Sequence, residues 1–251
     1  MTKLLPILLL ALAMSPAVHA QSTQAAMSID NAIQELSRMA NPADASSRLR
    51  GSTTFVSYHG DKEATEGSRL LFDDWPKGFV IGIYDTLLNN PNLFLNFDKI
   101  TRDLYFTLDG KTIIKVETSQ AREIHFINGN AQVVLTRVDG IDPHHFFQRM
   151  SDSAGAPNYI LYRLTTTQFR RANFTTNGLT STGNNFDEYI DDYDYFIVMP
   201  GGKLYTSVKL KKNSIRTALG DKADAWFKTH QNEKTDEAFL VGLVNHLNTS
   251  R

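Results

Sequence analysis

The chain has 251 residues, no cysteine, and 26 lysines and arginines against 27 aspartates and glutamates, which gives a formal net charge of −1. This even balance gives no electrostatic reason to expect binding to nucleic acid or to an anionic membrane. The lack of cysteine excludes disulfides, a thiol-linked lipid anchor, thiolate zinc ligands and a cysteine nucleophile.

The first twenty residues have the pattern of a secretory signal peptide. Lys3 gives a positive start, and residues 4–14 form an apolar run. Residues 17–20 then offer small residues where a signal peptidase would cut, after Ala20. The run is shorter than the roughly 20 apolar residues of a membrane-spanning helix. We therefore expect a chain without a transmembrane segment, exported to the periplasm or outside the cell after cleavage near Ala20.

Residues 21–50 are predicted to hold a short N-terminal helix. Its apolar residues recur at three- and four-residue steps: Ile29, Ile33, Leu36 and Met39. Ser28 suits the N-cap, and Asn41-Pro42 suits the end of the helix.

Residues 51–212 are predicted to form an antiparallel β domain. Its segments 78–84, 92–97 and 158–166 have strand character, and residues 169–186, rich in Thr and Asn, are predicted to be a long surface excursion.

The dipeptide Asn128-Gly129 predicts a hairpin with a two-residue turn. That turn would pair Phe126 with Ala131 and Ile124 with Val133, and would place His125 on the wetter opposite face.

The dipeptide Asp109-Gly110 predicts another hairpin, between residues 104–108 and 111–116. A two-residue turn there would place apolar side chains on both faces: Leu104, Phe106 and Ile113 on one, and Tyr105, Ile114 and Val116 on the other.

Residues 213–251 are predicted to be helical. One short helix should end at Gly220, and another should cover 221–230. A final helix capped by Thr235 carries an apolar stripe of Phe239, Leu240, Leu243, Val244 and Leu247. Because strands and helices are segregated, the fold class expected is α+β: an antiparallel β-rich sandwich or open half-barrel with a short N-terminal helix and C-terminal helices.

Five carboxylates fall within eight residues: Asp187, Glu188, Asp191, Asp192 and Asp194. They are weak candidates for calcium ligands, because their spacing does not match an EF-hand loop. We favour another explanation, in which Gly201-Gly202 centres a hairpin that pairs Met199 with Leu204. The acids would then face lysines across the strands: Asp194 opposite Lys209, Asp192 opposite Lys211, and Asp191 opposite Lys212.

Asp142-Pro143-His144-His145 suggests the start of a helical turn or a loop. Adjacent histidines diverge on either a strand or a helix, so a metal site there is not favoured. No metal, cofactor or catalytic motif is predicted, although two carboxylates of a hydrolase can lie anywhere in a sequence.

Several features occur in the order seen in a group of exported β-rich proteins of Gram-negative bacteria that have no assigned activity. These are residues 93–98, the 104–116 hairpin, Glu123-Ile124-His125-Phe126, Asp187-Glu188-Tyr189 and Leu219-Gly220-Asp221-Lys222. The chain resembles that group over about two thirds of its length, and the resemblance implies no particular site residues.

These features together predict an exported, non-catalytic binding or envelope-associated module whose partner is an unknown envelope component. One alternative is a periplasmic carrier of an apolar ligand such as a lipid, which would hold a large apolar cavity between sheet and helices. Another is a hydrolase that uses paired carboxylates in a cleft.

Overall fold

The structure is a computed structural model that describes residues 28, 31, 32, 34, 65–116, 118–151, 158–177, 179–202 and 204–249. The expected signal peptide lies outside the described residues, and so does most of the expected N-terminal helix. Of that helix, the backbone N–H of Asn31 donates to the Ser28 side chain at 3.3 Å, and Ala32 is buried in a hydrophobic core.

One open sheet of 11 strands dominates the described fold, which is β-rich α+β. Along the sheet the strands run β1-β12-β9-β8-β7-β6-β2-β3-β4-β5, and β13 also pairs with β12. Every pairing is antiparallel except that of β1 with β12. The strands are β1 (Thr65–Glu66), β2 (Lys77–Gly82), β3 (Leu87–Phe97), β4 (Leu104–Thr107), β5 (Ile114–Val116), β6 (Ala121–Asn128), β7 (Ala131–Val138), β8 (Asp142–Arg149), β9 (Ile160–Arg170), β12 (Asp187–Val198) and β13 (Tyr205–Val208).

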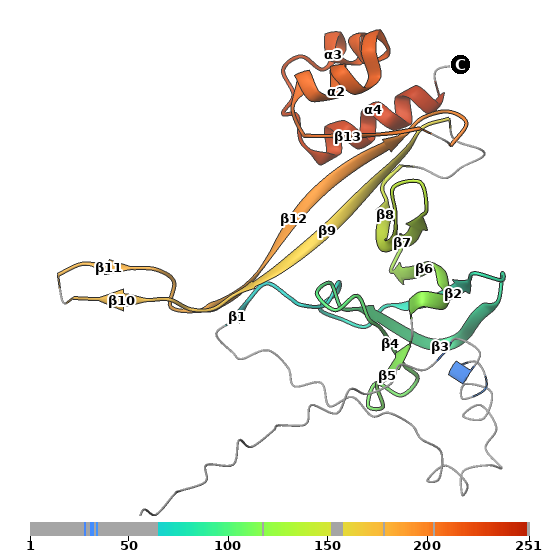
Figure 1. The fold of residues 1–251 in the computed structure, drawn as a ribbon, viewed down its shortest axis with the longest axis vertical. Coiled ribbons are helices and arrows are strands. Elements are labelled where there is room, and N and C mark those ends of the chain that lie inside the picture. Colours follow the sequence, from blue (N-terminus) through green and yellow to red (C-terminus); the bar gives the residue numbers. More distant parts are fainter. Residues whose placement is uncertain are drawn as a thin grey trace, which may run out of the picture.

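Figure 1 shows how the sheet curves. The long ribbon of β9 and β12 crosses the molecule, and the remaining strands turn away from it toward β3, β4 and β5. The sheet is therefore open within the described chain, and it does not form the two facing sheets of a sandwich.

The first hydrophobic core lies on the strands at the β2–β6 end of the sheet. Its largest fully buried side chains include Leu95, Phe106, Ile124 and Phe126. β2 packs tightly against its neighbours at Gly78, because a Cβ atom there would lie 2.2 Å from the carbonyl oxygen of His125.

The second core joins the C-terminal helices to β9, β12 and β13. The helices are α2 (Lys212–Leu219), the 3₁₀ turn η3 (Gly220–Ala223), α3 (Asp224–Thr229) and α4 (Glu237–Thr249). The apolar stripe predicted for the last helix is confirmed, since four of its five members are buried with Leu161 and Ile197 of the sheet: Phe239, Leu240, Leu243 and Val244.

The ends of these helices follow local chemistry. Gly220 has φ of 60°, which favours glycine, and it ends α2 as expected. The N-cap of α4 is Asp236 rather than the predicted Thr235: the Asp236 carboxylate accepts the backbone N–H of Phe239 at 3.1 Å. None of the helices in the described ranges is long and apolar enough to cross a membrane.

The hairpin between β12 and β13 has the predicted register. The N–H of Met199 donates to the Leu204 carbonyl at 2.8 Å, and Tyr195 pairs with Val208. Gly201 and Gly202 both have positive φ, so the two glycines fix the centre of the turn.

The register predicted for the β6–β7 hairpin is wrong by two residues. Ile124 pairs with Leu135 and Phe126 with Val133, so the turn is centred on Gly129-Asn130. Of these two, only Gly129 has positive φ, the pattern of a type II′ turn. Side chains alternate between the two faces with a period of two, so a register shift of two residues leaves each side chain on its predicted face. The apolar face and the wetter face of His125 are therefore as predicted.

The register predicted for the β4–β5 hairpin is wrong by one residue. Leu104 pairs with Val116 and Phe106 with Ile114, so all four buried side chains share one face. The connection is longer than two residues because Asp109 accepts the backbone N–H groups of Lys111 and Thr112. An odd error moves Ile114 and Val116 across the sheet, which removes the predicted second apolar face.

The segment 142–149, expected to begin as a helical turn or loop, is the strand β8. Local propensity was misleading here, since β8 is held on both sides by β7 and β9.

The surface excursion predicted at 169–186 is confirmed. It carries the separate two-stranded sheet of β10 (Thr175–Thr176) and β11 (Ser181–Thr182), and it extends away from the body in Figure 1.

Candidate functional site

The inner face of the sheet changes in chemical character along one row of paired residues. The row runs Val80, Ile124, Leu135, Gln148, Arg163, Tyr195 and Val208, each directly opposite the next. Residues directly opposite one another share a face. The row is buried and apolar at both ends, where the two cores lie, and polar at Gln148 and Arg163. We call this polar band between the cores the seam.

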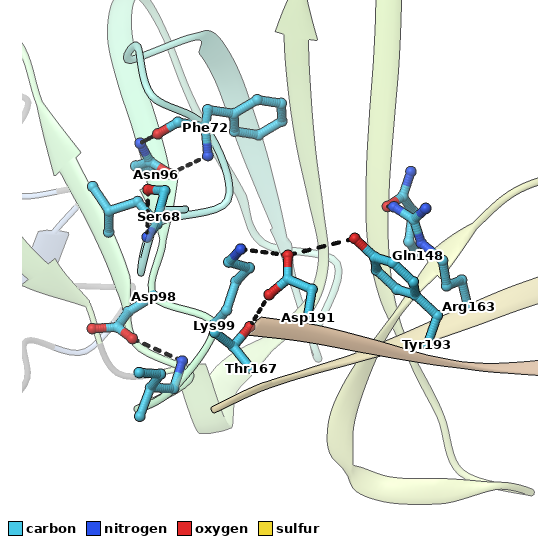
Figure 2. Close-up of polar contacts among 12 residues, drawn as sticks. Ser68, Phe72, Asn96, Asp98, Lys99, Gln148, Arg163, Thr167, Asp191 and Tyr193 are labelled. Atoms are coloured by element: carbon cyan, nitrogen blue, oxygen red, sulfur yellow. Dashed lines mark hydrogen bonds and ion pairs between the residues drawn. The ribbon is translucent and has the colours of Figure 1, made fainter. Parts of the chain in front are cut away.

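An ion pair crosses the seam between residues 92 positions apart in the chain. The Lys99 ammonium, just after β3, donates to the Asp191 carboxylate on β12 at 2.7 Å. Their side chains are 9 % and 24 % exposed, so solvent screens the pair only in part. The Thr167 hydroxyl donates to the other carboxylate oxygen, and Tyr193 lies next to it (Figure 2).

A second group of polar contacts joins the seam to the first turn of α4. Arg163 donates to Glu237 at 2.7 Å and to the Gln148 side chain at 2.6 Å. The Tyr195 hydroxyl donates to the same Glu237 carboxylate at 2.8 Å. Burial, and then the hydrogen bond to Glu237, raise the pKa of Tyr195, so the phenol keeps its proton and remains a donor. The Arg163 guanidinium also lies over the Tyr193 ring, 4.7 Å from its centre.

Lys99 is presented by a tightly bonded turn. The Asp98 carboxylate, almost fully buried, accepts the backbone N–H groups of Ile100 and Thr101 at 2.9 and 3.0 Å and is paired with Arg69. The neighbouring Asn96 holds the segment around Phe72, donating to the Phe72 carbonyl at 2.8 Å (Figure 2). The strand end and the segment 67–76 are thus fixed to each other.

An open hollow of about 650 Å³ lies beside this turn. Its walls come mainly from the segment 67–76, with Trp75 and Phe72 among them, and from Lys99 and Asn128. Asp73 and Asp74, both exposed, lie at its rim. The volume falls in the range of small-ligand pockets, roughly 300–1,000 Å³.

A second hollow lies at the seam and shares Leu71 and Lys99 with the first. Its floor is apolar and includes Phe97 and Phe146, and its rim includes Gln148 and Arg163. It measures about 30 Å³, the room of a single water molecule.

The predicted pairing of the acids with lysines across the hairpin is wrong. The register itself is correct, but β13 ends at Val208 and Lys212 begins α2, so Lys209, Lys211 and Lys212 do not continue the ladder. The long partner of β12 is β9, and it places Asp191 opposite Thr167 and Asp192 opposite Thr166.

The five acids do not converge on one point. Successive strand residues alternate between faces, so Asp187 and Asp191 lie on one face and Glu188, Asp192 and Asp194 on the other. Asp187 accepts the backbone N–H of Ala172, and Glu188 pairs with Arg170. In the described ranges no group of three or more His, Asp or Glu side chains is arranged to hold a metal ion.

Two of the histidines on the strands, His145 and His125, have local partners. His145 contacts Asp142 at 2.7 Å, and His125 lies between Glu123 and Gln132 and stacks on Phe79. These contacts give each ring a structural role in its strand.

Sequence analysis did not find Lys99, Arg163 or Glu237. Lys99 follows a buried strand end and Glu237 begins a helix, but neither position signals a partner 92 or 74 residues away. The chain matches no protein-family model, no curated protein and no solved structure.

Proposed function

We propose that the protein is an exported, non-catalytic binding module, a half-barrel whose inner side receives a small, mainly polar ligand in the hollow beside Trp75 and Lys99. The observation that carries the proposal is the hollow itself, about 650 Å³ with aromatic, carboxylate and amide side chains in its wall. Aromatic surface with a few polar groups is the usual lining of a small-molecule site.

Export rests on the first twenty residues, with their positive start, short apolar run and small residues before Ala20. Delivery to the periplasm or outside the cell would place the hollow among envelope components.

The two alternatives gain less support from the seam. A general acid of a hydrolase works from apolar surroundings, whereas Asp191 is paired with Lys99 and Glu237 with Arg163. A carrier of a lipid needs a large apolar cavity, whereas the apolar-floored hollow at the seam holds about 30 Å³.

The proposal is tested with protein secreted by a Gram-negative host and purified without denaturation. Native mass spectrometry is expected to show a fraction of molecules with one added small molecule, and Trp75→Ala is expected to lose it. Tyr84→Ala is the matched control, because this aromatic residue is 85 % exposed beyond the other end of β2. The proposal fails if the native protein carries nothing from either the periplasm or the growth medium, or if Trp75→Ala retains the added mass.

A further inference from the structure

The arm, residues 169–186, is exposed over almost its whole length. Every described residue from Gln168 to Thr182 is exposed, and the hairpin extends away from the main sheet in Figure 1. The described residues of the arm belong to none of the three hydrophobic cores, so the conformation of the arm depends on its own hydrogen bonds.

Local hydrogen bonds give the arm a defined conformation. Asn173 and Asn184 join its two sides through bonds of 2.8 and 2.9 Å, and Thr175 pairs with Thr182. At the tip, the Asn177 side chain accepts the backbone N–H groups of Leu179 and Thr180 at 3.0 and 2.8 Å. The tip therefore presents Leu179 on a bonded turn.

The arm combines apolar and basic side chains. Leu179 is 93 % exposed, the highest value among the exposed large apolar side chains of the described residues, and Phe174 is 49 % exposed. Residues 169–186 contain Arg170 and Arg171 but no acid, and the acids Asp187 and Glu188 lie at the base of the arm. Arg170 pairs with Glu188 at the base, and Arg171 is exposed.

We propose that this arm docks the protein on an anionic lipid surface. Exposed apolar side chains enter the interface between headgroups and acyl chains, arginine is attracted to anionic headgroups, and threonine and asparagine keep their hydrogen bonds there. A protein partner is less well matched, since the apolar side chains sit singly on a narrow hairpin and do not form the continuous patch typical of protein interfaces. The inference is independent of any ligand in the hollow.

The test is co-sedimentation of the secreted protein with vesicles. We expect binding to vesicles of phosphatidylethanolamine and phosphatidylglycerol, weaker binding to phosphatidylcholine vesicles, and release at high salt. Leu179→Asp is expected to lower the partition coefficient about tenfold through the loss of one inserted leucine, and Arg171→Gln to lower it about threefold to fivefold.

Leu204→Asp is the matched control. Leu204 is 72 % exposed on the β12–β13 hairpin, outside the arm, and its substitution is expected to leave the partition unchanged. Leu179→Trp should show a blue-shifted emission with phosphatidylglycerol vesicles, and Leu204→Trp should not. The proposal is overturned if the wild-type protein does not bind these vesicles, if Leu179→Asp binds as well as wild type, or if Leu204→Asp loses as much. Circular dichroism checks that each variant is folded.

Discussion

Lys99 and Asp191 connect the two ends of the inner face through a largely buried ion pair. Removing one partner of such a pair leaves the other charge with less compensation, which costs more than an exposed pair is worth. Thr167 remains as a hydrogen-bond donor to Asp191, so the loss is partly relieved.

We expect Lys99→Met to lower the free energy of unfolding by about 2–4 kcal/mol. The measurement is chemical denaturation, with Arg122→Met as control, because the pair of Arg122 with Asp85 is exposed and should contribute less than about 1 kcal/mol. The double variant Lys99→Met with Asp191→Asn should recover part of the loss. Equal effects of Lys99→Met and Arg122→Met would contradict the role assigned to the seam.

Asp109 gives a prediction about pH. Backbone hydrogen bonds, first from Thr112 and also from Lys111, lower the pKa of Asp109 from 3.8 to about 2. Because the folded-state pKa is the lower one, this carboxylate stabilises the fold above about pH 4, and the contribution is lost as the pH falls toward 2.

We expect Asp109→Ala to lower the free energy of unfolding by about 0.5–1 kcal/mol at neutral pH, a modest value because the group is mostly exposed. The difference from wild type should shrink between pH 4 and pH 2 in thermal denaturation. Asp192→Ala, an exposed aspartate on β12, is the control and should change stability by no more than about 0.5 kcal/mol. A difference that is constant over this pH range would disprove the assignment.

At the scale of elements, the close approach of β2 to β6 depends on Gly78. A Cβ atom there would lie 2.2 Å from the His125 carbonyl oxygen and 2.7 Å from a methyl carbon of Leu95. The first contact is with backbone, which cannot move without disturbing the ladder.

Gly78→Ala is therefore expected to destabilise the protein by at least about 2 kcal/mol. Gly140→Ala is the matched control, since a Cβ atom at Gly140 meets nothing within 4 Å, and its effect should stay within about 0.5 kcal/mol. The measurement is the free energy of unfolding of both variants by chemical denaturation. Equal values for Gly78→Ala and Gly140→Ala would refute the argument.

The hairpins show which elements a sequence can predict. Gly201-Gly202 leaves one place for the turn, so the β12–β13 register follows directly. Asn128-Gly129-Asn130 allows two neighbouring turns, and the structure uses the second. At Asp109 the side chain builds a wider loop through its own hydrogen bonds, which shifts the ladder by one residue.

The contacts that build the candidate site could not be predicted from the sequence. Turn residues and periodicity describe contacts between neighbours in the chain, whereas the seam is made by Lys99 with Asp191 and Arg163 with Glu237. Their meeting depends on the curvature of the whole sheet and on the docking of α4. Of the five clustered carboxylates at residues 187–194, only Asp191 contacts a residue of the seam.

At the scale of the whole molecule, the two larger cores share the inner face of one sheet without being continuous, and a smaller third cluster of Phe147, Tyr162 and Val198 lies on the other face. The first is centred on β2–β6 and the second on the C-terminal helices, with the seam between them. Truncation in one core should therefore loosen mainly that part of the fold.

We expect Leu240→Ala, at a fully buried position of α4, to cost about 2–5 kcal/mol locally. Hydrogen exchange followed by mass spectrometry should speed up in α2, α4 and β13 and stay unchanged in β4 and β6. Leu95→Ala is the reciprocal variant and should produce the opposite pattern. Uniform acceleration in both variants would show that the cores unfold as one unit.

The pairing of β1 with β12 has a consequence for how the chain is made. Thr65 meets Asp187, and Lys99 meets Asp191, so the first strand and the turn after β3 find these partners only when β12 is present. Contacts of such long sequence separation form slowly. Closure of the sheet by β12 is therefore a late step of folding, which follows the formation of local hairpins such as β3–β4 and β6–β7.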